Sequence, residues 1–94
     1  MGLDFDWNPR KAIVNRQRHR VSFEEAATVF NDLLGASFPD PDHSEEEDRF
    51  IAVGVSVRSR LLMVSYTERH DLIWIISARE LTRHERRHYE NTGF

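Results

Sequence analysis

The residues that first suggest chemistry are His84 and His88, which stand four apart in the segment "HERRH" near the end of the chain. Histidines at this spacing share one face of a helix and can bind one Zn²⁺, as in zinc proteases with the pattern H-E-x-x-H. A catalytic zinc also needs a third protein ligand and an open position for water. Only six residues follow His88, and Glu90 among them belongs to the same short segment. We therefore expect neither a metal site nor a cofactor here.

The residues around the two histidines support a different interpretation of this segment. Thr82 and Glu85 have the spacing of a capping box, in which each side chain accepts a hydrogen bond from the other's backbone N–H. This pairing accounts for Glu85 without a catalytic role, and Arg86 and Arg87 would add positive charge beside a dication. The segment is therefore predicted to be a capped helix that carries arginines, and a zinc peptidase is the disfavoured alternative.

Composition restricts the class of protein. The chain has 94 residues, of which 39% are hydrophobic and 31% are charged, as in soluble globular proteins, and we expect one domain over residues 1–94. It has no cysteine, which excludes disulfides and thiolate ligands. No apolar run approaches the roughly 18 residues that cross a bilayer, and the first residues lack a signal-peptide layout. These features predict a cytoplasmic protein without a membrane partner.

The cations are almost all arginine, which accounts for twelve of the thirteen. Residues 21–50 hold nine acidic residues and one basic one, so the flanking segments are basic. Arginine binds phosphate with two parallel hydrogen bonds and stacks on bases, so the bias favours a nucleic-acid or phosphate ligand. Arginine usage in a GC-rich genome, or ion pairs with surface glutamates, explains it equally well.

Hydrophobic spacing predicts a small α+β fold. Residues 3–7 alternate as a strand, and a helix follows with Asn8 as N-cap and Pro9 at its first position. A second helix follows Ser22, with Glu25 as its capping-box partner. A short strand is expected at 36–38, then a solvated acidic loop at 40–48 without the glycine of a calcium loop.

Three strands are predicted next, and their short connections indicate an antiparallel meander. In the first, the residues at period two that share an apolar face are Ile51, Val53, Val55 and Val57. The segments 61–67 and 72–77 are almost continuously apolar, as in central strands covered on both faces. The sheet should pack against two N-terminal helices and a C-terminal helix.

The sequence also resembles the BrnT toxins of bacterial type II toxin–antitoxin pairs. The resemblance rests on three blocks, "WNPRKAIVNRQRHRVSFEEA", "RFIAVG" with "LLMVSYTER", and "IISARELTRHERRHYE", which together cover nearly the whole chain. It implies a RelE-like fold and metal-independent endoribonuclease activity on cellular RNA, with inhibition of translation and growth. It also implies a hetero-oligomer with a BrnA-like antitoxin that carries a ribbon-helix-helix DNA-binding domain.

Two segments depart from the family pattern. Trp74 stands where members often have a basic residue directly before I-I-S-A-R, which could remove a phosphate contact. Arg18 and Arg20 stand where a lysine and a glycine are usual. A catalytically degenerate protein that binds antitoxin or RNA without cutting therefore remains an alternative to the ribonuclease.

RNA cleavage without a metal uses the ribose 2′-hydroxyl as nucleophile and needs a base, cations around the phosphorane and an acid for the 5′-oxygen. The candidate catalytic residues are Lys11, His19, Glu68, Arg69 and Arg79. Glu68 and His19 are the candidate bases, the arginines are the candidate cations, and Lys11 is an additional cation or the acid. The candidate RNA-binding residues are Arg18, Arg83, Arg87 and Tyr89. Trp74 is expected in the core, and Asn15 either belongs to the site beside His19 or makes a helix-to-sheet hydrogen bond.

Overall fold

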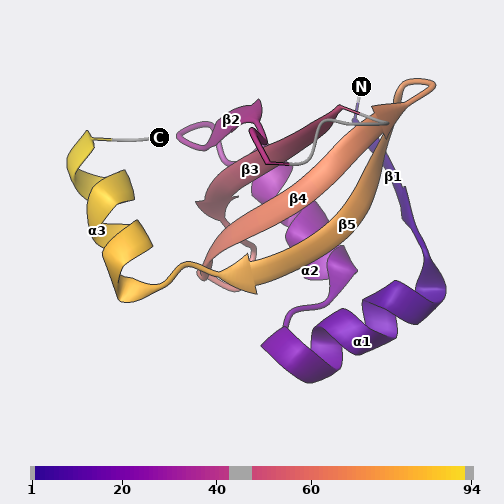
Figure 1. Ribbon diagram of the computed structural model, residues 1–94, viewed down its shortest axis with the longest axis horizontal. Coiled ribbons are helices and arrows are strands. Elements are labelled where there is room, and N and C mark those ends of the chain that lie inside the picture. Colours follow the sequence, from indigo (N-terminus) through magenta and orange to yellow (C-terminus); the bar gives the residue numbers. More distant parts are fainter. Residues whose placement is uncertain (1, 43–47, 93–94) are drawn as a thin grey trace.

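A computed structural model describes residues 2–42 and 48–92 of the chain (Figure 1). The elements in chain order are β1 (Asp4–Trp7), α1 (Pro9–His19), α2 (Phe23–Thr28), the 3₁₀ turn η1 (Val29–Asn31), β2 (Ala36–Pro39), β3 (Arg49–Val55), β4 (Leu61–Arg69), β5 (Leu72–Glu80) and α3 (Arg83–Thr92). The strands form one five-stranded sheet in the order β1-β5-β4-β3-β2. The predicted antiparallel meander is confirmed as β3–β5, and the predicted α+β class is confirmed with it. β1 adds a parallel edge strand beside β5, which the sequence analysis did not anticipate.

The three α-helices begin where their capping residues predict. The Asn8 side chain accepts hydrogen bonds from the backbone N–H groups of Arg10 and Lys11, and Ser22 accepts one from Glu25. The second capping box, Thr82 with Glu85, is closed in both directions. α1 is capped at its C-terminus by Arg20, whose φ of 60° is the left-handed conformation usually found for glycine at this position.

The main core lies between the sheet and the helices α1 and α2, which cover one face (Figure 1). It is built from Phe23, Leu62, Val64 and Ile75, each almost completely buried. On the opposite face, none of the helices of the described residues crosses β4 and β5 (Figure 1), and this face is called the open face below. A smaller cluster around Val53, Leu61 and Leu81 lies where α3 follows β5. Among the described residues no helix is long and apolar enough to span a membrane.

An irregularity in β5 decides which side chains point to the open face. Ser65 pairs with Ser77, but the next residue, Tyr66, pairs with Ile75, so Ile76 is an extra residue on β5. Strict alternation would place Ser77 and Arg79 on the buried face together with Ile75. The β-bulge reverses this parity, so that Ser77 and Arg79 face outward.

Several local expectations are corrected by the structure. Glu25 does not return the capping-box bond to Ser22, because its carboxylate binds Arg60 and the Ser56 hydroxyl. In β3 the expected face loses Val57, because the strand ends at Val55, whose side chain is exposed. Ile51 and Val53 on this face pack in the smaller cluster.

Two further corrections concern single side chains. Trp74 lies outside both core clusters, because it points to the open face. In the predicted solvated loop, Asp40 is buried and accepts a hydrogen bond from the Asp42 backbone N–H. Residues 43–47 of that loop lie outside the described part of the chain.

Candidate active site

A polar hollow of about 330 Å³ lies at one end of the open face. His19 borders it from the last turn of α1, Arg79 from the end of β5, and the directly paired residues Ser65 and Ser77 form part of its floor. Asp40, Asp42, Ile51 and Met63 complete its lining with the backbone of Ala78. Two of the five predicted catalytic residues, His19 and Arg79, are therefore brought together here. The hollow offers an imidazole, a guanidinium and two hydroxyls to one ligand, beside the carboxyl side chains of Asp40 and Asp42.

The buried side chain of Asn15 fixes this end of β5 to α1. Its amide nitrogen donates to the carbonyl oxygens of Val21 (3.0 Å) and Ala78 (2.9 Å), and its amide oxygen accepts from the Ala78 N–H (3.1 Å). β1 pairs with β5 only as far as Ile75, so Asn15 substitutes for a strand at Ala78. The helix-to-sheet interpretation of Asn15 is therefore confirmed. His19, one helical turn later, is carried to the same end of β5.

The guanidinium of Arg79 is held by Glu85 at the start of α3. Its two terminal nitrogens donate to the two Glu85 carboxylate oxygens at 2.7 and 2.9 Å. They also donate to the Glu80 carbonyl oxygen and to the Met63 sulfur. Four of the five guanidinium N–H groups thus have partners, and the group at Nε has none among the contacts of the described residues. Arg79 is well oriented, but a phosphate must share it with Glu85.

The pair of Arg79 and Glu85 makes stability depend on pH. The hydrogen bonds from Arg79, together with the capping bond from Thr82, lower the pKa of Glu85 to about 2 from its ordinary 4.5. A lowered pKa in the folded state contributes stability that is present above the ordinary value and lost as the pH falls. We therefore expect the difference in unfolding free energy between the parent and Glu85→Gln to be largest near neutral pH. Urea titrations should show it shrinking between pH 4.5 and 2, and a constant difference would contradict this assignment.

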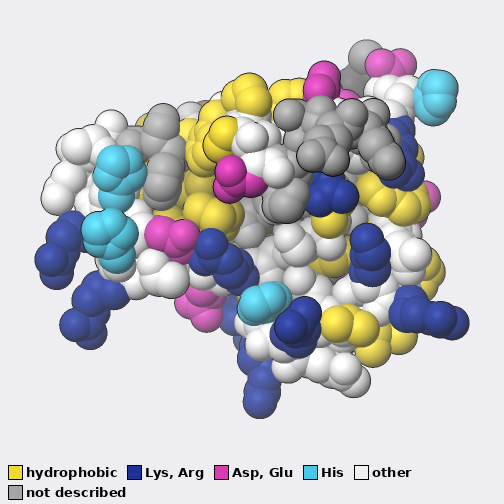
Figure 2. Space-filling view, viewed as in Figure 1, with side chains coloured by type: hydrophobic (Ala, Val, Ile, Leu, Met, Phe, Trp, Pro, Cys, Tyr) yellow, Lys and Arg dark blue, Asp and Glu magenta, His cyan; other side chains and the backbone are white. Residues whose placement is uncertain are grey.

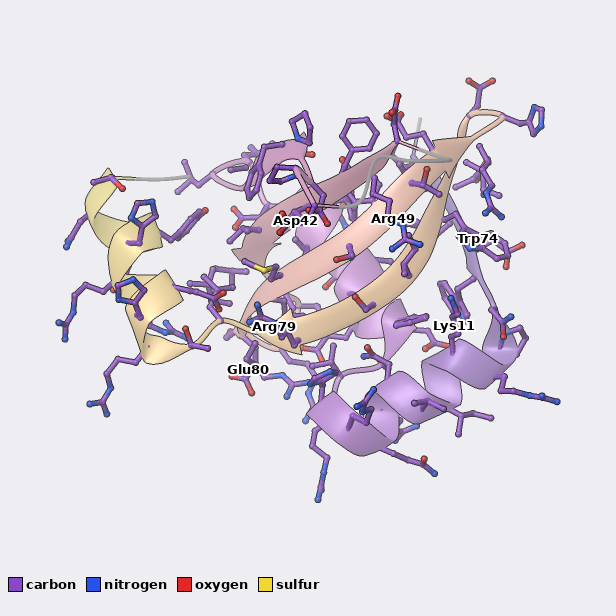
Figure 3. The ribbon with its side chains drawn as sticks, viewed as in Figure 1. Lys11, Asp42, Arg49, Trp74, Arg79 and Glu80 are labelled. Carbon is purple, nitrogen blue, oxygen red and sulfur yellow. The ribbon has the colours of Figure 1, made fainter. Side chains whose placement is uncertain are left out.

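The other end of the open face carries a second group of cations. The Arg69 guanidinium lies 4.7 Å from the centre of the Trp74 ring, a cation–π contact. Arg49, Thr67 and Trp74 form one cross-strand row, and Figure 3 shows Arg49 extending over the sheet between Asp42 and Trp74. Trp74, which stands where the family often has a basic residue, is therefore flanked by two arginines, Arg49 and Arg69.

The remaining predicted catalytic residues lie apart from the hollow. Arg69 pairs with Leu72, seven residues before Arg79 on β5, a separation of about 20 Å along the strand. Glu68 pairs with the core residue Ile73 and so belongs to the opposite face from Arg69. Lys11 shares the face of α1 that carries His19 but lies eight residues earlier, about 12 Å along the axis.

The four predicted RNA-binding residues do not line the hollow. Arg18 is exposed on α1, and Arg83 and Arg87 are exposed on α3, where Figure 2 shows Lys and Arg side chains projecting from the molecule. Tyr89 is half-buried, because its hydroxyl donates to the Leu34 carbonyl oxygen at 2.9 Å and its ring packs on the smaller core cluster. Tyr89 therefore holds α3 against the sheet.

The histidines of "HERRH" are both exposed on α3, and Glu85 between them is bound to Arg79 and Thr82. Over residues 2–42 and 48–92, no group of three or more His, Asp or Glu side chains is arranged to hold a metal ion. The capping interpretation of Glu85 is thus confirmed by both of its hydrogen bonds.

The hollow contains side chains that the sequence analysis missed. Ser65 and Ser77 are single polar residues inside apolar runs, a signal that could have identified both as functional candidates. Arg49 was noted only as a charge, and its position in the cross-strand row depends on the register. No feature of the sequence indicates that Asp40 is buried, because it belongs to a charged turn and its burial depends on the tertiary fold.

The fold and the hollow together define a small α+β protein whose open sheet face presents cations and hydroxyls, the groups that bind phosphate. Residues 7–85 match the family model described as "Ribonuclease toxin, BrnT, of type II toxin-antitoxin system", and the chain belongs to this family. A search of curated proteins finds no match. The crystal structure of the Brucella abortus ribonuclease toxin BrnT is similar in fold. It has a TM-score of 0.66 and 18% sequence identity, and the match covers 87% of this chain and all of the other.

Proposed function

We propose that this protein is a metal-independent endoribonuclease that cuts cellular RNA, inhibits translation and growth, and is neutralised by a BrnA-like ribbon-helix-helix antitoxin in the cytoplasm. The observation that carries the proposal is the hollow in which His19 and Arg79 meet the paired hydroxyls of Ser65 and Ser77. A β-bulge next to a polar hollow is a common feature of active sites, where it redirects side chains.

In this mechanism the His19 imidazole accepts the proton of the ribose 2′-hydroxyl, whose oxygen attacks the neighbouring phosphorus. Histidine can exchange protons near neutral pH without a large shift of its pKa. Arg79 and the serine hydroxyls stabilise the negative charge that develops on the phosphorane oxygens. The bond to the 5′-oxygen then breaks and that oxygen takes up a proton, which leaves a 2′,3′-cyclic phosphate and a 5′-hydroxyl.

The cations at the far end of the open face would extend the contact with RNA. Arg49 and Arg69 would bind phosphates of a single strand, with the Arg69 guanidinium held over the half-buried Trp74 ring. Lys11 lies between the two ends of the face (Figure 3) and would bind a phosphate rather than donate a proton at the cleaved bond.

The test is induced expression with growth and RNA integrity measured together, and purified protein incubated with RNA with and without EDTA. The proposal expects growth arrest and RNA fragments with 5′-hydroxyl ends, produced equally in EDTA. Intact RNA in the presence of folded protein would instead support the non-cutting binder, which the occupied N–H groups of Arg79 favour. Cleavage abolished by EDTA would overturn the metal-independent mechanism.

A further inference from the structure

The outer face of α1 carries arginines that the candidate active site does not use. Ile13, Arg16, Gln17 and Arg20 follow one another at helical spacing and form one stripe, away from the buried Asn15. Arg58 approaches this stripe from the connection between β3 and β4. Together these five residues line a surface hollow of about 710 Å³, called the arginine hollow below.

No ion pair of the described residues includes a guanidinium group of this hollow, and the charge of Arg58 interacts with that of Glu25 only at longer range. The carboxylates nearby, Glu25 and Glu80, are paired with Arg60. Arg60 also donates to the backbone carbonyl oxygen of Arg20 at 2.9 Å, which fixes the chain at the border of the hollow. Like charges that share a hollow without ion-pair partners repel one another and attract a polyanion.

We propose that the arginine hollow binds backbone phosphates of the RNA at a distance from the cleaved bond, an inference that rests on the proposed function. Guanidinium groups match phosphate oxygens in geometry, and no aromatic side chain lines the hollow to stack a base. The contact is therefore to the backbone and independent of base sequence.

The two hollows are bordered by adjacent residues at the end of α1. His19 borders the candidate active site and Arg20, the next residue, borders the arginine hollow. An RNA strand that leaves the first hollow around the last turn of α1 meets the second. An acidic protein segment is the other polyanion of suitable charge, but the position of the hollow next to the candidate active site favours RNA.

The experiment measures binding of a labelled single-stranded RNA of about 12 nucleotides, within the range of single-strand site sizes. Its 2′-hydroxyls are methylated, so it cannot be cut by the proposed route. Fluorescence anisotropy is recorded over a series of KCl concentrations for the parent and for Arg16→Gln with Arg58→Gln. Arg10→Gln with Arg86→Gln is the matched control, since it removes the same charge from exposed positions that do not line the hollow.

Loss of two phosphate contacts should lower the slope of log affinity against log salt by about 1.4, because each contact to a single strand contributes about 0.7. We expect this change, with a loss of affinity of about tenfold at low salt, in the test variant and little change of slope in the control. Equal changes in both variants would overturn the inference, since net charge alone would then explain them.

Parallel assays separate this inference from the proposed function. If the parent cleaves unmodified RNA but the test and control variants bind RNA equally, the proposed ribonuclease function is supported. The proposal that the arginine hollow binds RNA is then wrong. Binding that weakens only in the test variant supports the hollow even if the parent does not cut. A poly-glutamate peptide that binds through Arg16 and Arg58, with RNA binding unaffected, would assign the surface to an acidic protein and overturn the RNA assignment.

Discussion

Replacing Arg79 by alanine is expected to slow RNA cleavage by at least about 100-fold, because a donor aimed at developing charge typically contributes that much to the rate. Arg79 lies at the border of the hollow that also contains His19, and Glu85 holds its guanidinium in one orientation. Single-turnover cleavage of a defined RNA measures the chemical step directly. Growth inhibition in cells should be lost in parallel.

The alanine variant also removes the contact between β5 and α3, so a matched variant must break the same contact from the other side. Glu85→Ala releases α3 equally, and it removes a capping bond as well, but it leaves the guanidinium available to phosphate. We expect Glu85→Ala to retain cleavage within about tenfold, the loss associated with a less rigidly held cation. Equal losses of cleavage rate in both variants would show that Arg79 acts only by holding α3. Retained cleavage in Arg79→Ala would show that Arg79 is not a catalytic residue.

Local signals in the sequence were sufficient for the helices. Asn8, Ser22 and Thr82 each begin a helix as predicted, since an N-cap depends on neighbours within three residues. The meander was predictable for the same reason, because its connections are short. The pairing of β1 with β5 was not, since it joins segments about 70 residues apart and no local pattern specifies it.

The candidate site was predictable only in part, and the bulge at Ile76 explains why. The spacing of β5 gives Ile75, Ser77 and Arg79 the same parity, and no rule of alternation separates them. In the structure Ser65 pairs with Ser77 and Tyr66 pairs with Ile75, so Ile76 is an extra, unpaired residue of β5. This bulge turns the side chains of Ser77 and Arg79 to the open face. Their residue types identified His19 and Arg79 as candidate catalytic residues. That both line the same hollow depends on this register of β5.

Asn15→Asp is expected to destabilise the fold by about 3 kcal/mol or more at neutral pH. The substitution keeps the shape of the side chain but replaces the amide nitrogen, which donates to two buried carbonyl oxygens, by a carboxylate oxygen. A buried polar group without its partner costs about 1–3 kcal/mol, and a buried charge costs more. Because total stability is about 5–15 kcal/mol, the loss is a large fraction of it. Urea denaturation measures the change.

The same variant should depend on pH with the opposite sign to Glu85. Burial and the facing carbonyl oxygens raise the pKa of the new carboxyl in the folded state, so the protonated form favours folding. Stability is then greatest below the ordinary aspartate pKa of about 3.9 and falls as the pH rises above it. Loss of stability that does not vary with pH would mean that the side chain turns out into solvent.

Asn8→Asp is the matched control, because it makes the same chemical change on the same helix. The Asn8 side chain only accepts hydrogen bonds, from the N–H groups of Arg10 and Lys11, and a carboxylate accepts them equally well. A negative charge at a helix N-terminus is favourable by about 0.3–1 kcal/mol. Asn8→Asp should therefore leave stability unchanged or slightly raised at neutral pH. A large difference between the two variants would show that the two amide donors of Asn15, rather than the added charge alone, attach α1 to the end of β5 where the hollow forms.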